Sequence, residues 1–588
     1  MSDTRYRAIL TALGAFLLVL ICLSARGFTL RNVVTLANIR PGQLGEAAAL
    51  LPFIDANRLS TWIPGVTVGV PGGISNRTTI YTNLSTSATD VEIQAAIVAA
   101  PSGSVVQLTN GTYTLNGDIG FGFKKNVTLR GTGTNTILSA SAAIGQFIMV
   151  GGDYNWPSAK SITAGWSTGS SNITVDSASS LVVGMLARVD QLAVAGLSWD
   201  RTGDANSREI NQMVRIVAIN GNDLTIWPPI YYANGGTPQL HYVLEGGQAE
   251  FCGVEDLVLE VNGQSVSYGV VFEQTYGCWI KNVRMTNINN YNILFWRSLF
   301  GEIASCTMID SPDHGPNHTG ILIGPTSDKA SATGVLAYDN TIHRIFPGVE
   351  VNSSSGNVIA YNFVNDAFYD GFGQGVGIDV NHLGHCMFNL VEGNVVNTIQ
   401  NDGYFGSASH NTYFRNWAHG FVTDGLGGQS SSYNSAPLKL NHYSLSESAV
   451  GNVFGHSNIT PATYLASTNA YSYSHAVIAQ LGYPNMGANN YTGTFDADGD
   501  AQTIGEDQRR DLRVATNTIL HRNFDTYNGG FVTDVTRSND LPASLYLTVK
   551  PSWMKHAFPL VNPSNGLAGL FFTNLNAGYR FYYGTDLP

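Results

Sequence analysis

Four phrases in the middle of the chain repeat one order of apolar and polar positions. They are YDNTIHRI, AYNFVND, EGNVVNT and FRNWAHG, and each sets an asparagine between two short apolar segments. The asparagines are Asn340, Asn362, Asn394 and Asn416, at separations of 22, 32 and 22 residues. This spacing predicts a structural repeat of about 22 residues, with a ten-residue insertion in one copy.

The positions around each asparagine keep their polarity from repeat to repeat. Apolar residues stand three positions before it and two positions after it, namely Ala337, Ile359, Val391, Tyr413, Ile342, Val364, Val396 and Ala418. Such positions must point into a core, and the asparagine itself suits a sharp turn in the left-handed conformation. Stacked at about 4.8 Å per rung, the asparagine side chains can bond to one another up a column. The pattern predicts an all-β chain wound into a parallel β-helix, a solenoid of stacked rungs.

Outside the repeat, the hydrophobic pattern predicts two further units. A helix from about Asp90 to Ala100, with Thr89 or Asp90 as its N-cap, has one apolar face and is placed where it can cap the first rungs. Strand-like segments and an Asn220-Gly221 turn predict a small β insertion. The predicted divisions are 1–26 (signal peptide or anchor), 27–60 (leader), 61–158 (N-terminal cap and first rungs), 159–243 (inserted hairpins), 244–535 (main β-helix) and 536–588 (closing segment).

Composition and charge narrow the list of partners. Only 12% of the residues are charged, and 64 of the 588 are glycine, which favours short strands joined by tight turns over helices. The formal net charge is −12, with 30 Lys and Arg residues and no basic run. We therefore expect no nucleic-acid partner.

The N-terminus has the pattern of an export signal. Arg5 and Arg7 precede an apolar run from Ala8 to Leu23, and Ser24-Ala25 offers a cleavage site. The run is long for a signal peptide, so an uncleaved membrane anchor is the alternative. We expect a secreted or cell-envelope protein, in contact with a membrane only if this segment is retained.

The cysteines that follow this segment are Cys252, Cys278, Cys306 and Cys386. The first three are 26 and 28 residues apart, which is close to one solenoid turn. This spacing favours stacked, buried thiols over disulfides. It does not suit a zinc site.

Several stretches resemble the pectate-lyase-like superfamily of right-handed parallel β-helices, in particular a group of bacterial secreted proteins of mostly unassigned activity. They include VPGGISNRTTI, PSGSVVQLTNGTYTL, NVTLRGTG, GNVIAYNF, HLGHCMFNLVEGNVVNTIQNDGYFGSASHNTYFRN and LPASLYLTVKPSW. The resemblance implies one such fold for nearly the whole chain after about residue 60, and an affinity for carbohydrate. It does not imply a reaction, because the catalytic patterns of the superfamily's polygalacturonase-like hydrolases and pectate lyases are absent here.

The rung alignment also predicts where a site can form. His343, Asn365, Asn397 and His419 stand three positions after the ladder asparagines, and strand alternation points them outward as one polar column. The segments 366–386, 398–410 and 420–448 leave from the same edge and are predicted to wall a cleft beside this column. A polysaccharide chain is the expected occupant.

The cleft segments carry the candidate chemistry. The predicted catalytic residues are Asp370, Asp379, His382 and Asp402, and the predicted substrate-binding residues are His385, Glu392, Tyr404, His410, Arg415 and His419. Paired carboxylates suit glycoside hydrolysis, in which one acts as acid and the other as base or nucleophile. The alternative for each residue is structural, since Asp in Gly-rich loops often stabilises turns and aromatic residues pack loops together.

These residues predict a polysaccharide hydrolase ahead of a polysaccharide lyase, with a non-catalytic glycan-binding or surface protein as the alternative. No metal or cofactor is expected for hydrolysis. Calcium is expected as a cofactor only if the reaction is the elimination that a lyase catalyses. The sequence does not predict an oligomeric state.

Overall fold

The structure of the chain is a computed structural model. It describes residues 53–66, 73–74, 76–152, 159–198, 207–234, 236–312, 314–315, 318–326, 330–369, 374–423, 436–459, 463–465, 477–482 and 511–585. The chain divides into units 1–39 and 40–588, and the export segment lies outside the described residues. Within the described part, no helix has the length and apolar character needed to cross a membrane.

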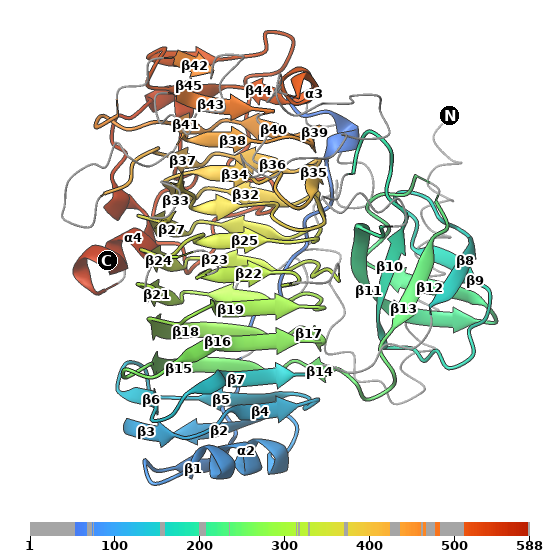
Figure 1. Ribbon diagram of the computed structural model, residues 1–588, viewed down its shortest axis with the longest axis vertical. Helices are drawn as coiled ribbons and strands as arrows, with labels where there is room; N and C mark the ends of the chain where they lie inside the picture. The colour runs from blue at the N-terminus through green and yellow to red at the C-terminus, as the bar shows by residue number, and fades with distance from the viewer. Residues whose placement is uncertain are drawn as a thin grey trace, which may run out of the picture. The chain divides into compact units, whose positions relative to one another are not determined.

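Three parallel sheets wind around one core and form the stacked rungs drawn in Figure 1. Sheet A contains β1 (Ile80–Leu84), β2 (Ser104–Leu108), β3 (Gly111–Leu115), β5 (Val127–Arg130), β6 (Thr136–Ala140), β15 (Gly253–Glu260), β18 (Trp279–Thr286), β20 (Glu302–Ala304), β21 (Thr307–Ile309), β23 (Leu336–Tyr338), β24 (Thr341–His343), β26 (Val358–Ala360), β27 (Phe363–Asn365), β32 (Leu390–Glu392), β33 (Val395–Val396), β36 (Thr412–Phe414), β37 (Trp417–Ala418), β40 (Ser448–Val450), β41 (Val453–Phe454), β44 (Ile519–His521), β45 (Asn523–Asp525) and the antiparallel edge strand β46 (Gly530–Val532).

The other two sheets complete each rung. Sheet B contains β4 (Ile119–Gly122), β7 (Ile144–Gly151), β16 (Val266–Glu273), β19 (Tyr291–Trp296), β22 (Ile321–Ile323), β25 (Val349–Val351), β30 (Ile378–Asp379), β34 (Ile399–Asn401), β38 (Leu438–Leu440), β42 (Thr463–Leu465) and β43 (Val477–Leu481). Sheet C contains β14 (Ala249–Glu250), β17 (Thr275–Tyr276), β31 (His385–Met387), β35 (Ser407–Ser409) and β39 (Ser444–Leu445), with single bridges in the rungs between them. A small antiparallel pair joins β28 (Phe368–Tyr369) to β29 (Gln374–Gly375). The fold is a right-handed parallel β-helix.

The predicted asparagine ladder is present and longer than the sequence repeat indicated. The side-chain nitrogen of Asn394 donates to Oδ1 of Asn416 at 2.9 Å, and its backbone N–H donates to the same oxygen at 3.0 Å. The same pairing runs from Asn340 to Asn362 and Asn394, and continues above Asn416 to Asn452 and Asn523. The positions predicted to point inward are all buried in the inner core.

The left-handed residue of each turn is the one before the asparagine, not the asparagine itself. Tyr361 has φ 56° and Arg415 has φ 52°, and Gly393 fills the same position. The prediction was wrong on this point because the asparagine side chain must point inward to reach the next rung, which its neighbour's left-handed conformation allows. A second ladder at the corner between sheets C and A joins Asn357, Asn389, Asn411 and the buried carboxyl group of Glu447.

The thiols are free and buried, as predicted. Cys252 and Cys278 stack in the lower part of the second ladder, where the backbone N–H of Cys252 lies 3.3 Å from Sγ of Cys278. Cys306 occupies the asparagine position just below Asn340 and donates its backbone N–H to Asn340 Oδ1. Small thiols and amides therefore occupy equivalent corner positions in different rungs.

Helix α2 (Asp90–Ala99) has Thr89 as its N-cap in a capping box with Glu92, and its Ile93 and Ile97 enter the inner core next to the first strands. The other helical elements are η4 (Ala56–Arg58), α3 (Leu512–Asn517), η5 (Pro563–Asn565), η6 (Phe572–Asn574) and α4 (Asn576–Tyr583).

The predicted β insertion is a closed six-stranded barrel. Its strands are β8 (Lys160–Ala164), β9 (Asn172–Val175), β10 (Leu186–Gln191), β11 (Ile210–Asn220), β12 (Asp223–Trp227) and β13 (Gln239–Tyr242). Strand β11 packs against sheet C, where Met213 donates its N–H to Thr333 Oγ1 and Asn211 bonds to Ser353 Oγ. The barrel therefore stands beside the sheet C side of the stack, as Figure 1 shows.

The two terminal segments bury the outer face of sheet A from β20 upward. Phe53, Ile54 and Trp62 join residues of the C-terminal segment in a second hydrophobic core over this face. The guanidinium group of Arg415 donates to the carbonyl oxygens of Leu541, Pro542 and Val561, and Arg580 pairs with Asp339 at 2.9 Å. The predicted closing segment, 536–588, thus runs along sheet A.

This cover also overturns the predicted cleft beside the column His343–His419. The ring of Phe581 lies 4.5 Å from that of His343, and the ring of Phe572 lies 5.0 Å from that of His419. The His343 and His419 side chains point outward from sheet A, as strand alternation requires, but they pack against the C-terminal segment. The segments predicted as cleft walls instead contain regular strands, β30 and β31 in one and β34 and β35 in the next.

We expect Asn394→Ala to lower the free energy of unfolding by about 3 kcal/mol, because it takes the acceptor from the buried backbone N–H of Asn362 and removes the side-chain hydrogen bonds to Asn362 and Asn416. Denaturant unfolding of the purified protein measures the loss. The control is Asn565→Ala at an exposed position, which should change stability by less than about 0.5 kcal/mol. Equal effects of the two variants would contradict a stabilising ladder.

Glu447 should make stability depend on pH. Burial raises its pKa well above the ordinary 4.5, so its contribution is present below that value and is lost as the pH rises through the folded-state pKa. Glu447→Gln keeps the hydrogen bonds to Asn411 and carries no charge. Unfolding midpoints measured at a series of pH values above 4.5 should fall more steeply for the wild type than for this variant; parallel curves would count against the assignment.

Candidate functional site

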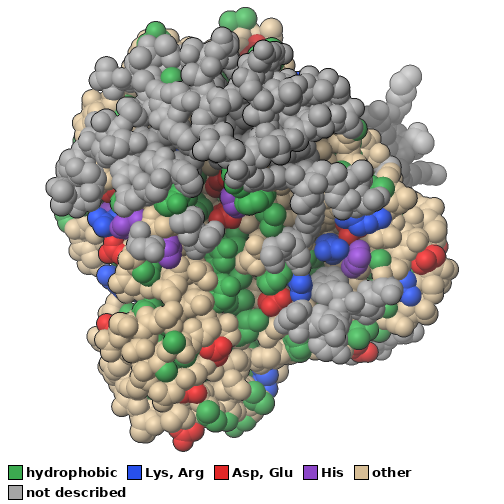
Figure 2. Space-filling view, in the orientation of Figure 1, with side chains coloured by type: hydrophobic (Ala, Val, Ile, Leu, Met, Phe, Trp, Pro, Cys, Tyr) green, Lys and Arg blue, Asp and Glu red, His purple; other side chains and the backbone are tan. Residues whose placement is uncertain are grey.

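The outer face of sheet B changes character along the stack. The strand register brings one outward position of each rung into a single column, which holds Met149, Val271, Leu294, Leu322, Glu350, Asp379, Gln400, Lys439 and Gln480 in order up the sheet. The lower part of this column is apolar and the upper part is polar. Figure 2 shows a band of hydrophobic side chains in a hollow between the rungs and the barrel, with acidic and histidine side chains at its upper end.

Asp379 is the centre of the polar part. Its Oδ1 accepts the backbone N–H groups of Asn381 and Asp402, each at 3.0 Å, and its Oδ2 accepts the side-chain amide of Gln400 at 2.9 Å. Burial and the negative charge of Asp402 raise the pKa of Asp379 well above its ordinary value. A carboxyl group held in its protonated form is a candidate general acid.

Asp402 follows β34 and pairs with His382, which lies in the turn after β30. Nδ1 of His382 is 2.6 Å from Oδ2 of Asp402, while Oδ1 of Asp402 accepts the backbone N–H of Tyr404 at 2.7 Å. Burial opposes the charge on the imidazole, but the charge and hydrogen bond of Asp402 outweigh it and raise the pKa of His382 to about 10. The His382 side chain is 35% exposed, so this charged group reaches the surface.

Glu350 and Lys439 lie below and above this pair. Oε1 of Glu350 accepts the side-chain amide of Asn352 at 2.6 Å. Nζ of Lys439 donates to the carbonyl oxygen of Gly375 at 3.2 Å, and burial lowers the pKa of this amine to about 7. The column therefore joins carboxyl groups to an amine that gives up its proton easily.

Aromatic side chains border the site. The rings of His382 and Tyr404 are 6.1 Å apart and nearly parallel, and Phe405 is exposed beside them. Along the apolar part of the column, Tyr268 stacks on Tyr291 at 5.7 Å. Flat rings beside hydrogen-bonding groups offer a surface on which the apolar face of a sugar ring can lie.

The structure brings Asp379, His382, Asp402 and Tyr404 together, and Asp370 lies outside the described residues. The remaining predicted residues lie elsewhere. His385 is fully buried on sheet C between the hydroxyl groups of Ser407 and Ser409, and its pKa is lowered to about 3 by burial.

Four more predicted binding residues act in packing. His410 stacks on Phe388 at 4.9 Å, and burial lowers its pKa to about 4. Glu392 accepts the hydroxyl group of Tyr361 at 2.7 Å and the backbone N–H of Leu545 at 2.8 Å, under the C-terminal segment. Arg415 and His419 contact the same segment.

Sequence reasoning missed Glu350 and Gln400, while Lys439 was considered only as a cation that a lyase would need. Their signal is a phrase of apolar, polar and apolar residues followed by a polar one, which recurs as VEVN, IDVN and LKLN; IQND keeps its first two positions and has Asn401 at the third. Alignment of these phrases places Glu350, Asp379, Gln400 and Lys439 in register on sheet B, as the strand pairing has them.

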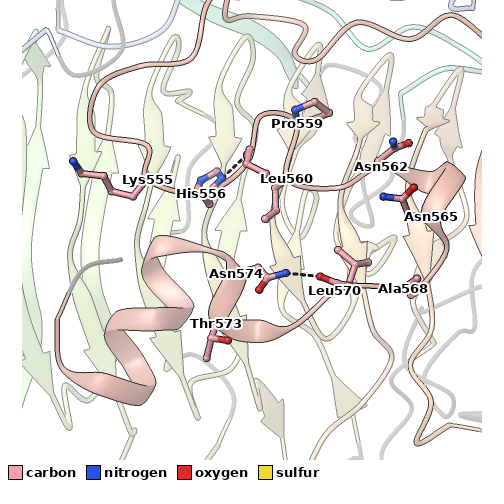
Figure 3. Close-up of a pocket in the computed structure, with 12 residues that line it drawn as sticks. Lys555, His556, Pro559, Leu560, Asn562, Asn565, Ala568, Leu570, Thr573 and Asn574 are labelled. Carbon is pink, nitrogen blue, oxygen red and sulfur yellow. Dashed lines mark hydrogen bonds between the residues drawn. The ribbon is translucent and has the colours of Figure 1, made fainter. Parts of the chain in front are cut away.

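A separate pocket of about 520 Å³ lies within the C-terminal segment. Figure 3 shows Lys555 and His556 at one end of it and Asn562 and Asn565 at the other. No predicted site residue lines this pocket.

Across the described residues, no group of three or more His, Cys, Asp or Glu side chains is arranged to hold a metal ion.

The His382–Asp402 pair gives a direct prediction. The pKa of His382 should be about 10 in the wild type, and Asp402→Asn should lower it, because burial of the imidazole is then opposed only by the weaker effects of Glu350 and Asp379. NMR titration of the protein with labelled histidine measures both values. A His382 pKa that does not move in the variant would contradict the pairing.

Comparison with known proteins gives fold similarity alone. No family model matches the chain, and no curated protein matches it. Solved structures that resemble it include the tailspike gp61 of Pseudomonas phage phi297, at 13% identity and a TM-score of 0.43, over 64% of this chain and 62% of that one. The match thus spans less than two thirds of the tailspike.

Two other similar structures carry the names of carbohydrate-active enzymes. The alginate lyase from Paenibacillus sp. str. FPU-7 is 12% identical over 63% of this chain and 94% of its own, with a TM-score of 0.34. The A-module of the mannuronan C-5 epimerase AlgE4 from Azotobacter vinelandii is 14% identical over 63% and 85%, with a TM-score of 0.31. These similarities go no further than the fold, and the architecture of this chain is a right-handed parallel β-helix.

Proposed function

We propose that this protein cleaves a polysaccharide on the outer face of sheet B, by hydrolysis at Asp379 and Asp402. The observation that carries the proposal is the difference between the two carboxyl groups. Burial and the charge of Asp402 raise the pKa of Asp379 well above its ordinary value, while Asp402 is held against the His382 imidazole. An acid beside a carboxylate is what hydrolysis of a glycosidic bond requires.

The reaction follows from these roles. Asp379 gives its proton to the glycosidic oxygen as the bond between that oxygen and the anomeric carbon breaks. A water molecule adds to the anomeric carbon, and Asp402 takes the proton that this water loses. Asp402 then releases that proton to solvent, and Asp379 takes one up, which restores both groups. His382 keeps Asp402 oriented through their 2.6 Å contact.

The surroundings suit a long substrate. The hollow in Figure 2 continues from the polar column over the apolar band that includes Tyr268 and Tyr291, so that several sugar units can lie along the stack. An extracytoplasmic location, as the N-terminal sequence predicts, belongs to this proposal because such polymers lie outside the cell.

One observation favours a second candidate, a glycan-binding protein without catalysis. The side chains of Asp379 and Asp402 are mostly covered, with residue exposures of 4% and 5%. Catalysis requires that a sugar reach Asp379, whereas binding needs only the more exposed His382, Tyr404 and Phe405.

We expect Asp379→Asn to reduce kcat about 10²- to 10⁴-fold on the glycan that the wild type cleaves, since the variant lacks the proton donor. The assay follows new reducing ends and ultraviolet absorbance over a panel of polysaccharides. Asp256→Asn, on the outer face of sheet A, is the matched control and should retain full activity.

Each result of this panel decides between the candidates. Reducing ends without ultraviolet absorbance support hydrolysis. Reducing ends with an absorbing, unsaturated product would contradict it and assign the chemistry to elimination, with Lys439 as the nearest amine base. Tight binding with no cleavage would leave the non-catalytic candidate.

A further inference from the structure

The barrel carries a cluster of cationic side chains around a buried carboxylate. Asp190 on β10 is fully buried, and its Oδ1 accepts from Nη1 of Arg208 at 2.6 Å. Its Oδ2 lies 3.0 Å from Nη2 of Arg188 and 3.0 Å from Nε2 of His241. Burial disfavours the charge on Asp190, but the hydrogen bond from His241 and the charges of Arg188 and Arg208 outweigh it and lower its pKa.

This arrangement fixes two guanidinium groups at the surface. Arg208 is also held through hydrogen bonds to the carbonyl oxygen and hydroxyl group of Thr237, at 2.8 and 3.1 Å. The side chains of Arg188, Arg208 and His241 remain 18%, 22% and 21% exposed. Two arginines against one aspartate leave a local positive charge on a chain whose net charge is −12.

The strand register links the cluster to the corner that follows sheet B. Asp190 pairs with Asn211 on the neighbouring strand β11, and the side chain of Asn211 bonds to Ser353 Oγ at 3.2 Å. Ser353 directly follows Asn352, whose amide holds Glu350 of the polar column. Figure 2 shows Lys or Arg and His side chains on the barrel at the side of the hollow.

We propose that Arg188 and Arg208 form an anion-binding subsite on the inserted barrel, which takes a carboxylate or sulfate group of an acidic polysaccharide lying over sheet B. The proposal deepens the proposed function and rests on it for the course of the polymer. Planar guanidinium groups bind such anions through paired N–H groups. Asp190 already holds the two guanidinium groups in place, so that binding need not order them.

A cluster that only stabilises the barrel would have a different signature. Loss of Arg188 and Arg208 would then lower the unfolding temperature of the protein but leave its affinity for polymers unchanged. The test must therefore measure binding directly, on protein whose fold has been verified by circular dichroism.

The experiment measures binding in the Asp379→Asn background, which separates affinity from cleavage. The probes are polygalacturonate for carboxylate, carrageenan for sulfate and a neutral glucan, each studied by affinity electrophoresis at low and high salt. Arg188→Gln with Arg208→Gln should weaken binding of one acidic probe at least about tenfold, a typical size for losing a charged contact, with no change for the neutral probe. The acidic probe that responds identifies the anion.

A matched double variant controls for net charge. Lys281→Gln with Arg284→Gln removes the same charge from exposed positions on sheet A and should leave affinity unchanged. The double variant Arg188→Lys with Arg208→Lys keeps the charge but lacks the planar guanidinium groups. Its affinity for the acidic probe should lie between that of the parent and that of the Arg188→Gln, Arg208→Gln variant.

Three results would overturn the subsite: no binding of either acidic probe by the parent, equal losses in the two glutamine double variants, or an unchanged affinity in the barrel variant. None of them bears on cleavage. If a glycan is still hydrolysed by protein with the glutamine substitutions in the barrel, the proposed function stands while the subsite fails.

Discussion

The upper rungs of this fold bury the backbone of their sharp corners, and amide ladders are the interaction that makes this possible. Within the ladder, Asn394 accepts two hydrogen bonds from Asn362 of the rung below and donates to the oxygen of Asn416 above, so that the turn N–H groups of Asn362 and Asn394 both have partners. Because the amide is rigid and short, it also fixes the register between rungs. A slip by one residue would turn an inward core position outward and break the ladder.

That register creates the candidate site. Once the rungs are aligned, residues from four separate phrases of the sequence fall into one outward column on sheet B, with Glu350, Asp379, Gln400 and Lys439 adjacent. Burial and the charge of Asp402 raise the pKa of Asp379, whereas burial lowers the pKa of Lys439 against the opposing charges of Asp379 and Asp402. Sheet A takes a different role, since both terminal segments cover its outer face from β20 upward.

The sequence predicted the repeat better than it predicted the face that carries the site. Asn340, Asn362, Asn394 and Asn416 mark the corner of sheet A, so the alignment was accurate there and its inward positions are buried. The column His343–His419 was read correctly as outward, yet its cover comes from Phe572 and Phe581, more than 150 residues further on. Local periodicity carries no information about such long-range packing.

The sequence grouped the acidic residues for one reason, and the structure brings them together for another. Asp379, His382 and Asp402 were grouped as members of cleft-wall loops, whereas they lie on or directly after strands of sheet B. Glu350 and Gln400 escaped notice because the strands of sheet B are only two to eight residues long. Their alternation of apolar and polar residues is a weaker signal than the asparagine repeat of sheet A.

The central claim is that the functional face is the outer face of sheet B. Hydrogen–deuterium exchange of the Asp379→Asn protein, with and without the glycan that the wild type binds or cleaves, tests it most directly. The account predicts slower exchange at residues 378–382 and 399–405 when the glycan is present, and no change at 341–343 and 417–419. Protection confined to the sheet A positions, with none on sheet B, would contradict it.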